Sequence, residues 1–314
     1  MSQTSTPSER CLVVFPGALG DFVCFLPALA ALQRRTRGAV TVVCQRSLLD
    51  LARIAGVAEA LPLEGIISAW LFMEEPPPAA HGFFSQFSAV EAFTGSNDLN
   101  LRMNLARWGF SVPHPFRSND RVHAAVHWLR ELGEPSDRVV ESRISPPDDW
   151  TSHRPHGGAI GMNNDRSLVV HPGSGGQAKR WSRSGFRAVC NRWAQRFEQP
   201  LLLLGPAEGG EVEEWRSPNM RVVYCDTLRE LVARLAGARA YLGNDSGVTH
   251  LAAALGLRGV ALFGPSDEHR WRPLGEAISV LRLEPWRGAD EDVSPSSIFE
   301  IGRALTAAMQ VQLP

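Results

Sequence analysis

The chain carries no excess of charge of either sign. Its 314 residues include 32 lysine and arginine residues against 33 aspartate and glutamate residues, which leaves a formal net charge of −1. No long-range field therefore favours nucleic acid or an anionic membrane surface as a partner. Long apolar runs are also missing, and none approaches the roughly 20 residues that a membrane-spanning helix needs. We expect a globular protein, long enough for two domains, without a nucleic-acid partner.

Cysteine is scarce and scattered. The cysteines are Cys11, Cys24, Cys44, Cys190 and Cys225. They form no CxxC pair, and an odd number fits a reducing compartment better than a disulfide framework. The first ten residues are polar and lack the apolar segment of a signal peptide. Together these features predict a cytoplasmic location.

Two familiar nucleotide-binding signatures are absent as well. No turn has the GxGxxG spacing of dinucleotide-binding folds, which argues against a NAD-linked oxidoreductase. The turn over 171–181 contains glycines and a lysine, but not at the P-loop spacing, which argues against a Walker-type NTPase.

Short apolar runs alternate with helical patterns in two parts of the chain. Strands are expected at 12–15, 40–44, 168–171, 201–204, 221–224, 239–242 and 260–263. This alternation predicts parallel sheets covered by helices. A proline- and glycine-rich stretch over 145–158 is expected to link the two parts. We predict an α/β protein with two Rossmann-like, doubly wound domains, 1–155 and 156–290, that face a cleft, and a final helix within 291–314.

Four turns follow the expected strands, at the edge where such sheets bind ligands. In the first, Pro16-Gly17-Ala18-Leu19-Gly20-Asp21, Asp21 is either a capping carboxylate or a group at the mouth of the cleft that accepts a proton. In the second, 171–181, three glycines stand close to Ser174 and Lys179. Bare N–H groups, a hydroxyl and a cation are what a phosphate site requires, and a surface loop is the alternative.

The remaining two turns also allow two interpretations each. Glu208 follows the strand at 201–204, where a carboxylate either binds ribose hydroxyls or favours a helix dipole. In the turn over 243–247, Asp245 and Ser246 are good capping residues, and Gly247 leaves the backbone accessible to an anion at the helix N-terminus. His250, one turn further on, either faces the cleft or packs.

These turns together resemble a known family. The segments GALGDFVCFLPALAAL, HPGSGGQAKRW, LGPAE, LGNDSGVTHLAAALG and ALFGPSD, in this order, resemble glycosyltransferase family nine, the lipopolysaccharide heptosyltransferases that use ADP-heptose. The resemblance runs nearly throughout 168–273, whereas in the first half it is confined mainly to the first strand-helix-strand unit. It implies a GT-B fold in which the last helix, over 295–309, packs back against the first domain.

The resemblance also implies residue roles. Asp21 matches the general base, Ser174 and Lys179 the ligands of the donor phosphates, and Glu208 the carboxylate on the donor ribose. The loop 225–227 matches the segment that holds the nucleobase. The residues matched to the region of the transferred sugar are Asp245 and, beside it, Ser246, Gly247 and His250.

The implied chemistry is inverting transfer from a nucleotide sugar, by default ADP-heptose, to a hydroxyl of a cell-envelope glycan or glycolipid such as lipopolysaccharide core. It requires no cofactor and no metal. Contact with the inner membrane face would come only through the acceptor.

Departures from the family concern the acceptor. Family members carry a basic residue and small hydroxyls before Gly-Asp, where this chain has Phe15, Pro16, Gly17 and Ala18, which does not match an anionic Kdo acceptor. The region 65–120 also has its own character. Two alternatives to a heptosyltransferase stay open: a GT-B enzyme for another nucleotide sugar, such as another transferase or an epimerase, and a non-catalytic nucleotide-sugar-binding relative.

Overall fold

The computed structural model describes residues 10–37, 39–135, 142–152 and 167–310, and the chain divides into two compact units, Met1–Arg138 and Val139–Pro314. The boundary falls earlier than the predicted position after residue 155. The short helix α7 (Asp148–Ser152), inside the expected linker, belongs to the second unit, where Trp150 is buried and Asp149 pairs with Arg229 at 2.7 Å. Burial of the apolar Trp150 side chain stabilises the contact between α7 and the second unit, so this part of the proline-rich stretch is not a free linker.

The first unit is built on four parallel strands in the order β3-β2-β1-β4. The strands are β1 (Cys11–Val14), β2 (Val40–Cys44), β3 (Glu59–Pro62) and β4 (Ala89–Ala92). The helices are α1 (Leu19–Arg35), α2 (Leu49–Ile54), α3 (Ile66–Phe72), α4 (Pro78–Phe84), α5 (Leu99–Arg107) and α6 (Ala124–Glu131).

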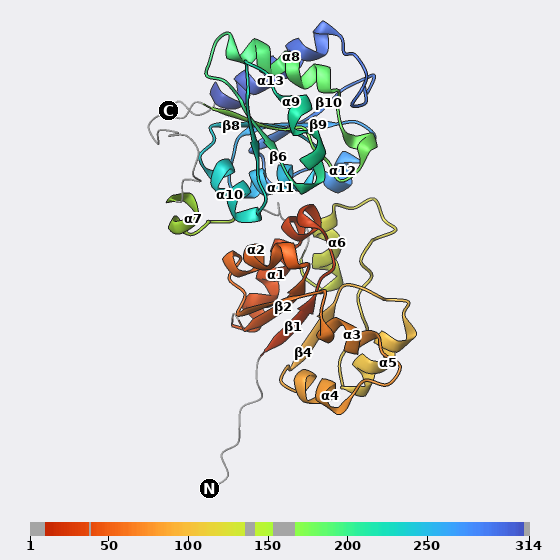
Figure 1. The fold of residues 1–314 in the computed structure, drawn as a ribbon. Helices are drawn as coiled ribbons and strands as arrows, with labels where there is room; N and C mark the ends of the chain where they lie inside the picture. The colour runs from red at the N-terminus through yellow and green to blue at the C-terminus, as the bar shows by residue number, and fades with distance from the viewer. Residues whose placement is uncertain (1–9, 38, 136–141, 153–166, 311–314) are drawn as a thin grey trace. The chain divides into compact units, whose positions relative to one another are not determined.

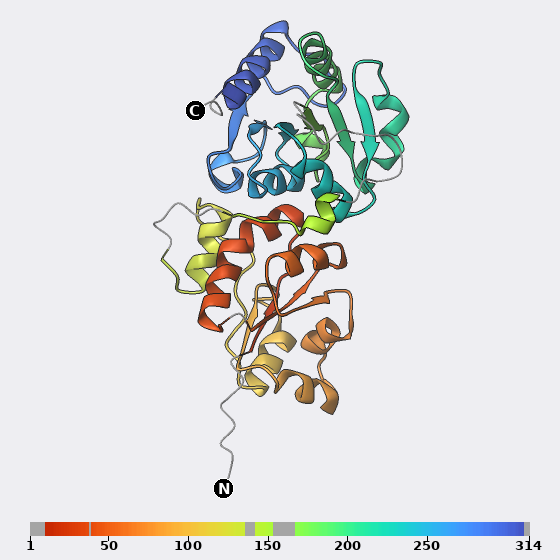
Figure 2. The same ribbon diagram turned by 90° about the vertical axis from the view of Figure 1, so that its left-hand side faces the viewer.

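Helices cover both faces of this sheet. Leu12 and Val14 point to the face covered by α3, α4 and α5, as the two-residue period of a strand requires. Helices α1 and α6 lie side by side (Figure 2), and an aromatic cluster joins them to the end of β1. In this cluster the Phe15 ring stacks on Phe25 at 4.3 Å and meets Trp128 edge-on at 5.1 Å. The turn after β1 therefore begins at a tightly packed aromatic cluster.

The second unit is built on six parallel strands in the order β10-β9-β8-β5-β6-β7. The strands are β5 (Leu168–His171), β6 (Leu201–Leu204), β7 (Arg221–Tyr224), β8 (Ala240–Asn244), β9 (Gly259–Phe263) and β10 (Ile278–Arg282). Counted from β5, this is the doubly wound order, in which the direction of winding reverses between the first and fourth strands. The reversal places the turns that follow β5 and β8 next to each other.

Two layers of helices enclose this sheet. The elements are α8 (Arg183–Ala194), α9 (Val212–Trp215), α10 (Leu228–Ala236), α11 (Gly247–Ala254), α12 (Glu268–Trp271), α13 (Pro295–Gln310) and the 3₁₀ turns η2 (Gln177–Lys179) and η3 (Pro206–Glu211). Helices α8 and α13 cover one face, and α10 and α11 lie on the other (Figure 1). Phe186, Trp193 and Leu305 from the first pair enter one core with Leu168 and Leu242 of the sheet.

The final helix, α13, packs into the core of the second unit. Ile301 and Leu305 of α13 are fully buried in the core of the second unit, and the helix contacts β8, β9, β10 and α8. These contacts make α13 part of the second unit, and the packing of the last helix against the first domain, which the family resemblance implied, stays a prediction. Among the described residues, no helix is both long and apolar enough to cross a membrane.

Candidate functional site

The predicted donor residues gather where the turns after β5 and β8 meet. Strands β5 and β8 are paired in register, with His171 opposite Gly243. The side-chain amide of Asn244 joins the two turns: its nitrogen donates to the Pro172 carbonyl at 2.7 Å, and its oxygen accepts from the Trp181 N–H at 3.1 Å. Asn244 is fully buried, so these bonds fix the path of the glycine-rich turn.

Ser174 and Lys179 both contact Asp245. The Ser174 hydroxyl donates to the Asp245 backbone carbonyl at 2.7 Å, and the Lys179 ammonium donates to the Asp245 carboxylate at 2.8 Å. The Asp245 residue is 4% exposed, whereas the Lys179 side chain is 39% exposed. The ammonium is therefore the more exposed member of this ion pair.

The amino-acid composition sets Lys179 apart, although the motifs do not. Lys179 is the only lysine in the 314 residues, and every other basic side chain counted with it is an arginine. A lysine is a compact point charge with three donors, whereas arginine is a planar fork, so the two are not equivalent at a phosphate site. The composition itself thus singles out this position.

The turn after β8 leads into the N-terminus of α11. Ser246 is the N-cap residue, and its hydroxyl accepts from the Thr249 N–H at 3.3 Å, as predicted for a capping residue. Gly247 is the first helical residue, where a backbone N–H lacks an intrahelical partner. The Thr249 hydroxyl donates to the Asn244 carbonyl at 2.5 Å, and the His250 side chain is buried in the same helix.

Glu208 lies in the turn after β6 and is almost completely buried. Its carboxylate accepts from the Gly205 N–H at 3.0 Å and from the Arg180 guanidinium at 3.3 Å. Gly173 of the neighbouring turn runs so close that a Cβ atom there would collide with this carboxylate and with the His171 ring, which favours glycine at that position. Glu208 is thus held against the glycine-rich turn by two donors and a close backbone approach.

His171 lies close to the same carboxylate. Burial lowers the pKa of His171 from its ordinary value of 6.5, although the Glu208 charge and a bond to the Leu203 carbonyl act in the opposite direction. The imidazole is therefore neutral at pH 7, with Nδ1 3.1 Å from the Leu203 carbonyl oxygen.

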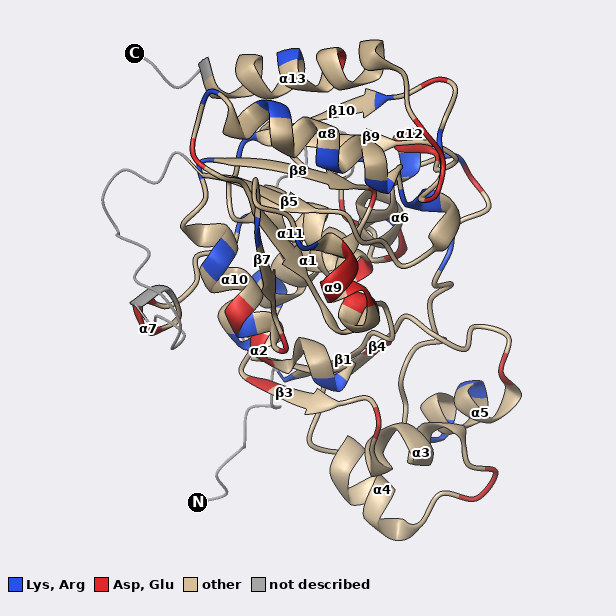
Figure 3. Ribbon diagram, turned by 45° about the horizontal axis from the view of Figure 1, so that its top comes forward, with Lys and Arg blue, Asp and Glu red and all other residues tan. Residues whose placement is uncertain are grey.

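Two further residues brace the glycine-rich turn. Arg180 also pairs with Glu211 at 2.6 Å, which connects the turn to the acidic residues around α9 (Figure 3). The Trp286 indole donates to the Ala178 carbonyl at 3.1 Å, and the ring lies against Gly264, where a Cβ atom would collide with it. Trp286 therefore connects the turn after β5 to the turn after β9.

The thiols offer no nucleophile to this site. All five cysteines are buried, and burial raises the pKa of Cys190 to about 12 and that of Cys225 to about 11. The thiols stay protonated at neutral pH and behave as apolar core residues. Among the described residues, no group of histidine, cysteine, aspartate or glutamate side chains is arranged to hold a metal ion.

Asp21 belongs to the first unit, at the third position of α1. Its carboxylate accepts from the Ala18 N–H at 3.3 Å, so the capping interpretation is correct as far as local structure goes. Arg117 donates to the two carboxylate oxygens at 2.9 and 3.5 Å. This partner, 96 residues further along the chain, has no local signal in the sequence.

The fold and these turns define a class of protein. Two parallel α/β units, one with a glycine-rich turn and a helix N-terminus at its topological switch point, are the architecture of nucleotide-binding Rossmann-like proteins. The chain belongs to glycosyltransferase family 9 (heptosyltransferase), whose sequence pattern it matches over residues 122–296.

Comparison with curated proteins gives distant relatives of the same kind. The chain is 28% identical over 190 residues to lipopolysaccharide heptosyltransferase 3 of Escherichia coli, which is 57% of this chain and 54% of that protein. It is 31% identical over 112 residues to lipooligosaccharide heptosyltransferase 2 of Campylobacter jejuni, which is 33% of this chain and 35% of that protein. In the first of these matches the chain spans about half the length of its relative.

Comparison with solved structures extends the likeness to the whole fold. The structure of the E. coli ADP-heptose lipopolysaccharide heptosyltransferase II has a TM-score of 0.75 at 18% identity, and the match covers 96% of this chain and 99% of that one. A family 9 glycosyltransferase from Veillonella parvula has a TM-score of 0.73 at 16% identity, with 96% and 97% covered. The predicted GT-B fold, with two Rossmann-like units, is therefore confirmed.

Proposed function

We propose that this protein is an inverting glycosyltransferase that transfers a sugar from a nucleoside diphosphate sugar to a hydroxyl acceptor. The observation that carries the proposal is the arrangement of Lys179, Ser174 and Asp245 at the N-terminus of α11. A cation, a hydroxyl and unpaired helix N–H groups at one point suit a diphosphate. Family membership supports the reaction class.

The proposed donor site divides the nucleotide sugar among the turns of the second unit. Lys179 leaves the Asp245 carboxylate and binds the diphosphate, which allows Asp245 to accept hydroxyl groups of the sugar. Glu208 accepts the vicinal hydroxyls of the ribose, and the loop 225–227, directly after β7, holds the nucleobase. The N-terminus of α11, with Ser246, Gly247 and His250, lies next to the diphosphate in this arrangement.

The proposed reaction is a single displacement. The acceptor oxygen attacks the anomeric carbon, the bond from that carbon to the phosphate oxygen breaks, and Asp21 takes the acceptor proton. Lys179 and the α11 N-terminus stabilise the charge that grows on the leaving diphosphate, and this fixed electrostatic field takes the place of a divalent cation. Arg117 orients the Asp21 carboxylate through its two bonds.

ADP-heptose is the donor that we propose first, because the E. coli heptosyltransferase II of similar fold is named for it. The acceptor proposed is a cell-envelope glycan such as lipopolysaccharide core, after the names of the curated relatives. The alternatives are another nucleotide sugar, transferred or epimerised, and a binding protein without turnover.

The test measures binding and turnover separately. Calorimetry with ADP, UDP and GDP identifies the nucleotide, and turnover of ADP-heptose with a lipopolysaccharide acceptor is then followed with and without EDTA. We expect ADP to bind best and turnover to persist in EDTA. Preference for UDP or GDP would contradict the ADP-sugar assignment, binding without turnover would favour the non-catalytic alternative, and loss of turnover in EDTA would exclude a metal-independent reaction.

A further inference from the structure

A groove lies between α8 and α13, on the face of the second sheet that these helices cover. It has a volume of about 450 Å³, within the range of about 300–1,000 Å³ that small-molecule sites occupy. Its lining comes from 189–197 and 298–307, and so includes the end of α8 away from the glycine-rich turn. The groove is therefore separate from the donor residues described above.

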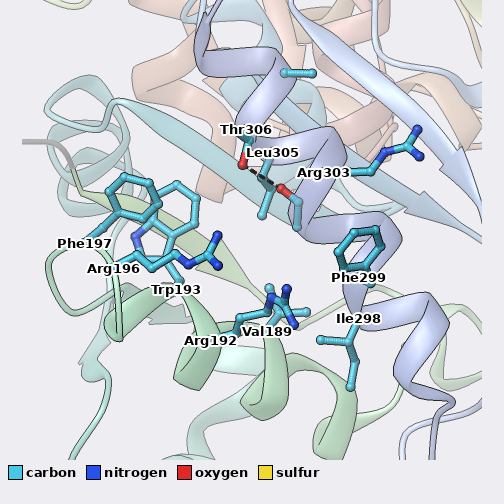
Figure 4. A pocket seen from close by; sticks show the side chains of 12 residues that line it. Val189, Arg192, Trp193, Arg196, Phe197, Ile298, Phe299, Arg303, Leu305 and Thr306 are labelled. Carbon is cyan, nitrogen blue, oxygen red and sulfur yellow. Dashed lines mark hydrogen bonds between the residues drawn. The ribbon is translucent and has the colours of Figure 1, made fainter.

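The lining combines apolar surface with positive charge. Trp193, Phe197 and Phe299 provide aromatic surface, and the Trp193 and Phe197 rings lie 4.5 Å apart (Figure 4). Phe299 is 52% exposed, whereas Ile301 and Leu305 of the same helix are fully buried in the core. A partly enclosed apolar surface of this kind favours an apolar ligand.

Three arginines, Arg192, Arg196 and Arg303, line the same groove, and none of the described residues that line it is acidic. Within the described parts of the chain, none of the three forms an ion pair with a carboxylate, whereas arginines elsewhere on the same unit, such as Arg180, do. The Arg192 guanidinium carbon lies 5.3 Å from the centre of the Phe299 ring, where it joins charge to the apolar surface. Figure 3 shows basic residues on both helices.

A buried donor in the lining lacks an acceptor. The Trp193 indole N–H is shielded from solvent and has no hydrogen-bond partner among the described residues. Such groups are uncommon in folded proteins, because an unpaired buried N–H costs free energy.

We propose that this groove binds a small anionic amphiphile, a molecule with one phosphate or carboxylate group and a single alkyl chain. The arginines complement the anionic group, and the aromatic surface complements the first part of the chain. The ligand must match both parts of the lining. A purely apolar ligand would leave the arginines without an anionic partner, and a free anion would leave the aromatic rings exposed to water.

The test uses dodecyl phosphate below its micellar concentration as the probe, with neutral dodecyl maltoside and inorganic phosphate as comparison ligands. Calorimetry should give saturable binding of dodecyl phosphate, at least about ten-fold tighter than either comparison. The double variant R192Q/R303Q should weaken it by about ten-fold, and Phe299→Ser should weaken it while leaving the charge intact. Arg216→Gln, an exposed arginine outside the groove, is the matched control and should change nothing.

Several outcomes would overturn the proposal. Equal affinity for dodecyl maltoside would remove the role of the arginines, and unchanged affinity in R192Q/R303Q would place the probe elsewhere. Binding to vesicles of equal parts phosphatidylglycerol and phosphatidylcholine, with no binding of dodecyl phosphate, would indicate a membrane surface instead. Circular dichroism establishes that the variants are folded, and none of these measurements depends on the glycosyltransferase assignment.

Discussion

The two units hold their predicted site residues in different ways. In the second unit Lys179 and Asp245 bind each other across the switch point, and Asn244 fixes the turn from inside the core. In the first unit Asp21 is held by one backbone N–H and by Arg117, whose side chain is 46% exposed. The proposed donor side is thus a network of hydrogen bonds around the buried residues Asn244 and Asp245, whereas the proposed base depends on one ion pair with an exposed arginine.

This difference indicates how well each unit tolerates amino-acid substitution near its predicted site residues. A buried polar network tolerates little substitution, because removing one member leaves the others unpaired. The family match over 122–296 falls mainly on the unit with such a network. The Asp21–Arg117 ion pair involves fewer neighbouring side chains, so it restricts the sequence around it less. This agrees with the departure of residues 65–120 from the family pattern. Changes at single residues in each unit can break or sharpen this comparison.

Asp21→Asn should abolish most of the transfer activity while donor binding survives. A general base contributes about 10²–10⁴-fold, and the amide keeps the shape of the carboxylate without its basicity. Turnover measured beside ADP calorimetry checks this. Asp50→Asn, which removes an exposed carboxylate paired with Arg53 at 2.7 Å, is the matched control. Near-normal turnover in Asp21→Asn would remove this residue from the mechanism.

Lys179→Gln should weaken nucleoside diphosphate binding by about 10- to 100-fold, because one charge-assisted contact is lost. Since Lys179 is the only lysine, an amine-reactive reagent should modify this side chain and otherwise only the α-amino group. Mass spectrometry should then show that bound ADP protects Lys179. Equal modification with and without saturating ADP would contradict a contact between the ammonium and the phosphates.

Trp286→Phe should weaken donor binding by about three- to ten-fold, because the bond to the Ala178 carbonyl is lost while the ring is kept against Gly264. The effect should appear in the KM for the donor more than in kcat, since Trp286 acts through the turn that carries Lys179. Trp271→Phe, on the surface helix α12, serves as the control. An unchanged KM in Trp286→Phe would show that the hydrogen bond from Trp286 to Ala178 is not needed for donor binding.

Acidification should destabilise the protein through His171. Its pKa is lowered in the folded state, so the unfolded chain binds the proton first, and stability falls as the pH drops below the ordinary value of 6.5. One such group contributes a slope of at most about 1.4 kcal/mol per pH unit. Urea unfolding at pH 7.5 and 5.5 measures it, and His171→Gln should reduce the difference while the exposed His269→Gln does not. An unchanged pH dependence in His171→Gln would show that His171 is not the group responsible.

Much of the second unit was predictable from the sequence. Strands β5, β6, β7 and β9 lie where the apolar runs predicted them, and Thr227 and Ser246 cap the helices that follow β7 and β8. These features are local, since a buried strand needs a run of apolar residues and a helix needs a side-chain acceptor at its N-cap. The same local patterns placed the main candidate residues directly after strands: Asp21, Lys179, Glu208 and Asp245.

Three strands had no usable signal in the sequence. Strands β3, β4 and β10 all lie at sheet edges, where one side has no neighbouring strand. β3 and β10 are only partly buried, and β3 contains Pro62, which a central strand would not accept. Weak burial gives β3 and β10 a weak apolar pattern, whereas β7, which is also an edge strand, keeps a recognisable run in Val222-Val223-Tyr224.

The sequence by itself determined the class of fold, the turns and the residues that occupy them, because strand, turn and helix signals depend on neighbours a few residues away. Only the tertiary structure decided which of those residues meet. The pairing of Asp21 with Arg117, the placement of α13 on the second sheet and the arginine-lined groove beside it all join distant parts of the chain. Their formation depends on how the whole core packs, which no local pattern encodes.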